Sequence, residues 1–69
     1  MTIEALLGLT RNHSGDCREI FSFIDGALHT VSDGHVDISV AALKTTLGGA
    51  YDNAIAYINT MKDALDELE

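Results

Sequence analysis

The sequence predicts an all-α fold: an antiparallel hairpin of helices over about residues 16–32 and 38–67, with a short helix over about residues 3–9 before it. Apolar residues recur at intervals of three and four, which is the spacing of one helix face. Proline is absent, and 46% of the 69 residues are hydrophobic, as in folded globular chains. A chain of this length has room for one hydrophobic core, so we expect residues 1–69 to form a single helical domain.

The short first helix is expected to begin after Thr2, a residue type that commonly caps helices. Ile3, Leu6 and Leu7 follow at helical spacing. The next polar stretch, residues 11–15, contains asparagine, serine and glycine, which favour turn conformations. We therefore expect a loop there.

The second helix is expected to begin at Asp16. Glu19 follows three residues later, which is the spacing of a capping box, where each side chain accepts a hydrogen bond from the other residue's backbone N–H. The apolar residues that follow share one side of a helical wheel: Cys17, Ile20, Phe21, Ile24, Ala27, Leu28 and Val31. Asp33-Gly34 is a turn signal, and Gly34 can take the left-handed conformation that often ends a helix, so the helix should stop near Ser32.

The third helix is expected to start at Asp37 as its cap, with Val36 packing on Ala41. Its apolar residues have a period close to 3.6: Val36, Val40, Leu43, Leu47, Tyr51, Ala54, Ile58, Met61, Leu65 and Leu68. Gly48-Gly49 lies in the middle and costs about 2 kcal/mol relative to two alanines. The stripe keeps its face across the glycines, which favours a continuous helix. A break there would instead give a compact monomer of three or four helices.

The expected helix lengths are unequal, because a rise of about 1.5 Å per residue makes the second helix about 25 Å long and the third about 45 Å. The second helix would leave part of the third without cover, and the first helix or a second copy of the chain would have to cover it. Phe23 and Tyr57 flank the main stripes and widen the apolar band. We therefore expect a homodimer that forms a helical bundle. The apolar interaction residues we predict are Ile58, Met61, Leu65, Leu68, Phe23 and Tyr57.

The charge of the chain limits its partners. Eleven acidic residues against four basic ones give a net charge of -7. No basic patch is available to neutralise a phosphate backbone, so we expect no direct contact with nucleic acid. No apolar run approaches the length of about 18 residues that a membrane span needs, so we expect no membrane insertion and a cytoplasmic protein.

The sequence offers little chemistry. Cys17 is the only cysteine, so the chain has no internal disulfide. His13 lies four residues before Cys17, but a structural zinc site needs four ligands, and His29 and His35 are expected about 20 Å away. Serine, histidine and acidic residues show no catalytic spacing. We therefore predict no enzymatic activity, no metal and no cofactor.

These observations favour a small non-enzymatic module for protein–protein interaction or regulation that acts through apolar helix faces. The alternative is an acidic inhibitor, of the kind that mobile elements encode, that presents carboxylates to a nucleic-acid-binding protein. The residues for that role are Asp52, Asp63, Asp66 and Glu67, on the side away from the apolar stripe. A third possibility is a thiol- or metal-dependent protein that uses Cys17.

Overall fold

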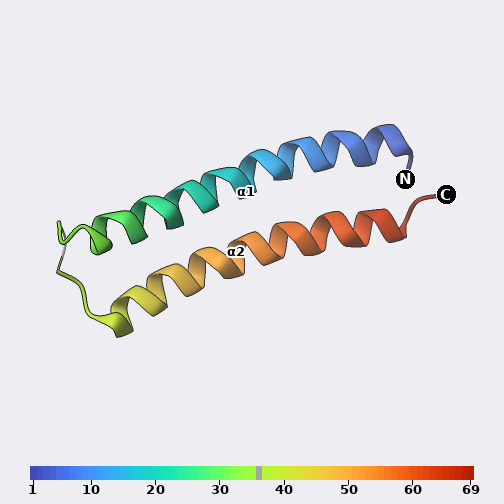
Figure 1. The fold of residues 1–69 in the computed structure, drawn as a ribbon. Helices are drawn as coiled ribbons and strands as arrows, with labels where there is room; N and C mark the ends of the chain where they lie inside the picture. Colours follow the sequence, from blue (N-terminus) through green and yellow to red (C-terminus); the bar gives the residue numbers. More distant parts are fainter. Residues whose placement is uncertain (36) are drawn as a thin grey trace.

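The chain folds as two long antiparallel helices, α1 (Ile3–Ser32) and α2 (Val40–Asp66), joined by a short connection (Figure 1). The structure, a computed structural model, describes residues 1–35 and 37–69. The hairpin measures 51 × 18 × 10 Å. The expected all-α antiparallel hairpin is therefore confirmed. The predicted packing of Val36 lies outside the described residues.

The amino-terminal end of α1 is capped as expected. The Thr2 side-chain oxygen accepts a hydrogen bond from the Ala5 backbone N–H at 3.1 Å, and Glu4 lies in the first turn. A carboxylate at this end interacts favourably with the helix dipole. This cap starts the whole of α1, and not a separate short helix.

The loop expected over residues 11–15 is wrong, because these residues are helical and α1 runs through them without a break. Asp16 is consequently an interior residue, and the predicted capping box with Glu19 does not form a helix start. Tertiary packing explains the difference. Weak helix formers such as Gly15 cost up to about 1 kcal/mol each, but packing of one face against a second helix outweighs such costs.

The carboxyl-terminal end of α1 closes in a Schellman motif, as the Asp33-Gly34 signal predicted. Gly34 has φ 76°, and its N–H donates to the Val31 carbonyl at 3.1 Å. The His35 N–H donates to the Thr30 carbonyl, also at 3.1 Å. Two carbonyls of the last turn thus find partners, and the chain leaves the helix axis.

The cap of α2 is Ser39 and not the predicted Asp37. The Ser39 hydroxyl accepts a hydrogen bond from the Ala42 N–H at 3.1 Å. From there α2 continues through Gly48-Gly49, so the predicted continuous helix is confirmed. Both glycines are exposed and have open space where a Cβ would lie, so neither marks a close approach between the two helices.

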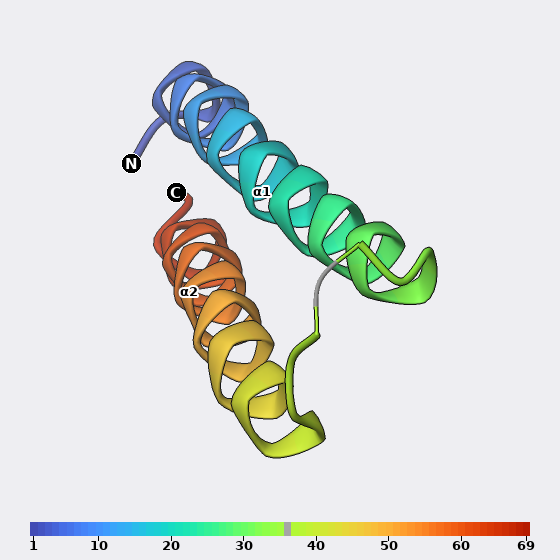
Figure 2. The same ribbon diagram turned by 90° about the vertical axis from the view of Figure 1, so that its left-hand side faces the viewer.

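The two helices cover each other along most of their length, as two views of the ribbon agree (Figures 1 and 2). α1 has 30 residues and α2 has 27, so the predicted mismatch between a short and a long helix is wrong. The termini lie at one end of the hairpin, where the Met1 amino group donates to the Glu67 carbonyl at 3.2 Å. The carboxyl-terminal half of α2 is therefore paired with the amino-terminal half of α1.

The core between the helices is thin. Its buried hydrophobic residues are Cys17, Ile24, Leu47, Ala54 and Ala64, and three of these are small. Two packed helices contact each other along a single line. Most apolar side chains are therefore covered by the other helix on one side and exposed to water on the other. The uncovered apolar area becomes the main feature of the surface.

Candidate interaction surface

The contact line between α1 and α2 follows a strict seven-residue repeat. The covered positions step by three and four residues along both helices, as in a coiled coil. We call these residues the seam: Leu6, Thr10, His13, Cys17, Ile20, Ile24, Ala27 and Val31 from α1, and Leu43, Leu47, Ala50, Ala54, Tyr57, Met61, Ala64 and Leu68 from α2 and the residues just after it. Every one of them is buried or half-buried.

A second row of apolar residues lies directly beside the seam and is exposed. We call it the apolar face: Leu7, Phe21 and Leu28 from α1, and Tyr51, Ile58 and Leu65 from α2. Their exposed fractions lie between 43 and 54%. Each follows a seam residue by one position, so each projects to the same flank of its helix.

The two halves of the apolar face lie on one side of the hairpin. In an antiparallel pair of helices, equivalent positions of the seven-residue repeat face each other across the seam. The residues one position after 6, 13, 20 and 27 in α1 therefore lie on the same flank as those one position after 43, 50, 57 and 64 in α2. The opposite flank confirms this geometry, because Phe23, Thr46 and Asn53, which precede seam positions by one, line a shared cleft that spans both helices. The apolar rows of α1 and α2 therefore both lie on the other flank.

The flank opposite the apolar face is largely polar. Thr46, Asn53 and Thr60 from α2 are exposed there. Phe23 is the exposed aromatic residue on this side, at 53%. Near the connection between the helices, this flank opens into a cleft of about 450 Å³ lined by Phe23, Ala27, Thr30, Val31, Ile38, Leu43, Thr46 and Leu47, among others. This end of the flank is thus apolar.

The predicted apolar interaction residues are divided between these surfaces. Ile58 and Leu65 belong to the apolar face, with exposed fractions of 48 and 54%. Tyr57, Met61 and Leu68 lie in the seam and are half-buried, so they serve the contact between α1 and α2. Phe23 lies on the opposite flank. The structure therefore does not bring the predicted set together as one surface.

Other members of the apolar face did not enter the predicted set: Leu7, Phe21, Leu28 and Tyr51. A signal for them exists in the sequence, because 51, 58 and 65 are seven residues apart in one helix, and 7, 21 and 28 fall on the same repeat in the other, with Ser14 at the position between 7 and 21. The signal is visible only when α1 is read as one helix. The expected loop at residues 11–15 concealed it.

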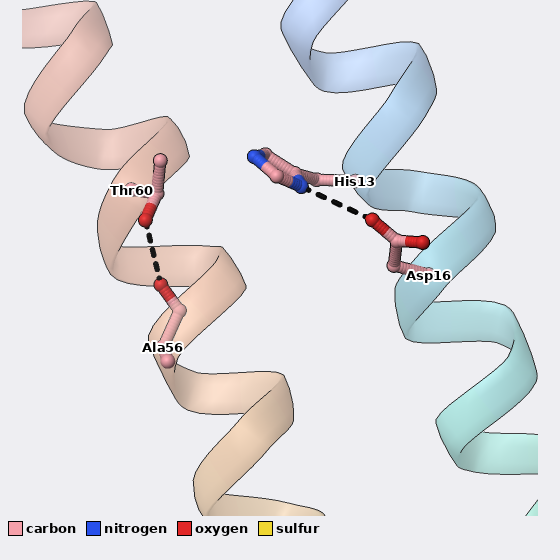
Figure 3. Close-up of polar contacts among 4 residues, drawn as sticks. All are labelled: His13, Asp16, Ala56 and Thr60. Atoms are coloured by element: carbon pink, nitrogen blue, oxygen red, sulfur yellow. Dashed lines mark hydrogen bonds and ion pairs between the residues drawn. The ribbon is translucent and has the colours of Figure 1, made fainter.

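A small polar cluster interrupts the seam. His13 projects from α1 toward α2, and its ring lies 4.9 Å from the ring of Tyr57, centroid to centroid (Figure 3). Its Nδ1 lies 3.3 Å from Asp16 Oδ2, one turn further along α1. Nearby on α2, the Thr60 hydroxyl donates to the Ala56 carbonyl at 3.0 Å. These polar groups find partners locally, so the cluster lets a histidine occupy the seam.

Cys17 is a buried seam residue with a free thiol. Within residues 1–35 and 37–69, no three His, Cys, Asp or Glu side chains gather as a metal ion would need. His13 and Cys17 share the seam, and Asp16 contacts His13, but these side chains do not gather into such a group. The arrangement is that of a small residue packed between two helices.

The four predicted acidic residues, Asp52, Asp63, Asp66 and Glu67, are all exposed on or just after α2. Asp52 and Asp66 point directly away from the seam by their place in the repeat, while Asp63 and Glu67 lean to the side opposite the apolar face. The histidine–carboxylate contacts among the described residues, His13 with Asp16 and His29 with Asp25, do not include them.

The four basic residues are all placed on or beside the apolar face. Lys44 occupies the same row as Tyr51. Three others each follow by one position a seam residue of the alternate set, which places them beside the apolar face as its rim: Arg11, Arg18 and Lys62. All are exposed. Glu4 and Asp25 are the acidic residues of α1 in this rim, and α2 contributes none. The other nine of the eleven acidic residues lie elsewhere on the chain.

In the part of the chain that the structure describes, neither helix combines the length and the apolar character that crossing a membrane requires. Comparison with protein-family models, with curated proteins and with solved structures finds no match to this chain.

Proposed function

We propose that this chain is a non-enzymatic module for protein–protein interaction that acts by docking its apolar face on another protein surface. The observation that carries this proposal is the row of large apolar side chains, each about half exposed, on one side of the hairpin. Extended apolar patches on soluble proteins commonly mark sites of interaction, whereas scattered exposed apolar residues do not. The seven-residue repeat places these side chains on one flank of each helix, with Ser14 between Leu7 and Phe21.

The shape of the apolar face suits a helical partner. It extends along a hairpin whose longest dimension is 51 Å. Anchors one heptad apart on each helix match the way a partner helix places apolar side chains along one of its own faces. We propose the cytoplasm as its compartment, because a reducing environment suits the free thiol of Cys17.

A pair of charge substitutions on α2 tests this function. Ile58→Glu places a carboxylate in the apolar face, while Thr60→Glu adds the same charge on the opposite flank, two residues away. A tagged chain is used to capture proteins from its native cells. We expect the wild type and Thr60→Glu to retain the same partner and Ile58→Glu to lose it. Equal retention by all three chains would exclude the apolar face as the docking surface.

A specific observation also favours the acidic alternative, in which the chain inhibits a nucleic-acid-binding protein by presenting carboxylates to it. All the basic residues lie on or beside the apolar face, so the side of α2 that carries Asp52, Asp63, Asp66 and Glu67 is purely acidic among its charged groups. Such a surface complements a basic groove.

Salt separates the two functions. Binding of an acidic surface to a basic one weakens as salt screens the charges, whereas apolar docking does not. For the acidic inhibitor, binding of the captured partner should fall steeply between about 0.05 and 0.5 M NaCl. It should also fall in the variant Asp63→Asn/Asp66→Asn. Binding that survives both changes would remove this candidate.

A further inference from the structure

We infer that the occupant of the apolar face is a second copy of this chain, so that two hairpins pack face to face as a four-helix dimer. This inference rests on the proposed function and names its partner. It follows from three properties of the molecule: the area that one hairpin leaves exposed, the small size of its core, and the distribution of its charges.

The exposed area of the hairpin is too large for a compact monomer. One chain of 7.4 kDa exposes 5105 Å². A folded monomer of this mass is expected to expose about 4200 Å², so the hairpin exceeds it by about 900 Å². The radius of gyration shows the same excess, since it is 15.8 Å, against about 11 Å for a compact chain of this length.

The excess area corresponds to one side of a dimer interface. A protein–protein interface of standard size buries about 800 Å² on each partner. A second hairpin on the apolar face would therefore bring the exposed area per chain close to that of a compact protein. It would also supply the second layer that a pair of helices lacks.

The core of one hairpin is small for a chain with no disulfide. Among the buried residues that the structure describes, Ile24 and Leu47 are the large aliphatic ones. Chains of about this size commonly need a staple such as a disulfide, a metal or a partner subunit. Packing two apolar faces together would bury Phe21, Ile58 and their neighbours and roughly double the apolar layer.

The charges permit self-association through the apolar face and oppose it elsewhere. The face itself carries one charged residue, Lys44, and its rim combines Arg11, Arg18 and Lys62 with Glu4 and Asp25. Elsewhere the charged side chains are acidic, so two chains of charge -7 that met through another side would bring carboxylates together. The remaining interface is the one between two apolar faces. It is isologous, because each copy contributes the same surface.

Two phenylalanines give a matched test. Phe21 and Phe23 are two residues apart and similarly exposed, at 49 and 53%, but only Phe21 belongs to the apolar face. Sedimentation equilibrium of the wild type at about 100 μM should give twice the mass of one chain, and its thermal midpoint should rise with protein concentration. Phe21→Glu should raise the dissociation constant at least about 30-fold, and Phe23→Glu should leave the dimer intact.

Loss of the dimer in Phe21→Glu supports the inference whether the released chain stays helical or unfolds. A wild type of single-chain mass with a thermal midpoint independent of concentration would overturn it. Equal dissociation of both variants, or a wild-type assembly other than a dimer, would overturn it too. A monomeric wild type whose captured partner is lost in Ile58→Glu would refute the second copy and leave the proposed function standing.

Discussion

At the residue scale, the connection between the helices depends on Gly34. Its φ of 76° lies in the left-handed region, where a Cβ is strained, so we expect Gly34→Ala to lower the free energy of unfolding by about 1 kcal/mol. The loss should appear as a lower urea midpoint at a fixed protein concentration. Nothing lies within 4 Å of the added Cβ, so the cost is conformational and not steric.

Gly26 is the control for this substitution. It is an exposed residue in the interior of α1 with open space around its Cα. Gly26→Ala should therefore raise the free energy of unfolding by up to about 1 kcal/mol. If both alanines shifted the urea midpoint in the same direction, the left-handed cap of α1 would not be the source of the effect.

The seam residue Ile24 should contribute more to stability than any exposed isoleucine. It is 4% exposed, and Ile24→Ala removes buried methyl groups and leaves a cavity, so we expect a loss of about 3 kcal/mol. Ile55, which is 51% exposed, is the comparison. Ile55→Ala should cost less than about 1 kcal/mol in the same urea titration, because that side chain already contacts water. Similar losses for the two would contradict the assignment of the seam.

Single capping residues were only partly predictable from the sequence. Thr2 and Gly34 each stand alone as candidates at the ends of α1, and both were predicted. Asp37 and Ser39 are both good caps and stand two residues apart, and the structure uses Ser39. Local preference cannot choose between two residues of similar quality, so the choice depends on where packing of the helix begins.

At the element scale, α1 shows why a local pattern can conceal a long helix. Gly8, Asn12, Ser14 and Gly15 are weak helix formers, and together they resemble a loop. The seam nevertheless passes through the same stretch with Thr10 and His13, which are polar and so gave no apolar periodicity. A polar residue in the seam is identified only by its position opposite the other helix. A short stretch of sequence does not contain that helix, so it cannot reveal the position.

The repeat of the helix also explains why the exposed apolar face was predicted only in part. The expected stripe and the seam of α2 share every second member from Leu47 to Leu68, and both repeat every seven residues, so the period does not separate them. The expected stripe took Tyr51, Ile58 and Leu65, while the seam takes Ala50, Tyr57 and Ala64. Both rows are apolar, so the sequence alone does not indicate which row meets α1. Two apolar rows side by side are themselves the signature of a second interface.

The glycine pair in α2 gives a prediction at this scale. Gly48 and Gly49 lie outside the seam in an unbroken helix, with open space around both. Gly48→Ala/Gly49→Ala should therefore raise the free energy of unfolding by about 2 kcal/mol, measured by urea titration at one protein concentration. A lower stability of the double variant would show that the glycines serve a bend or a close approach in the assembled protein.

At the scale of the whole molecule, charge and apolar area are separated. One side of the hairpin carries the apolar face with all the basic residues, and the Asp and Glu residues other than Glu4 and Asp25 lie on the rest of the surface. Fold class, charge and the absence of a long apolar span could be read from the sequence, because they depend on composition and period. The separation of charge from apolar area could not be read from the sequence. It depends on which residues of the two helices lie on the same side of the hairpin, and the pairing of α1 with α2 determines this.

This separation predicts how salt acts on the dimer that we propose. Each chain carries a charge of -7, so association brings two acidic bodies together, and screening lowers that repulsion. We expect the dimer dissociation constant to fall as NaCl rises from about 0.02 to 0.5 M, by sedimentation. Asp52→Lys, a change on the outer side of α2, should strengthen the dimer at low salt and flatten its salt dependence. A dissociation constant that instead rose with salt would mean that ion pairs, and not the apolar face, hold the two copies together.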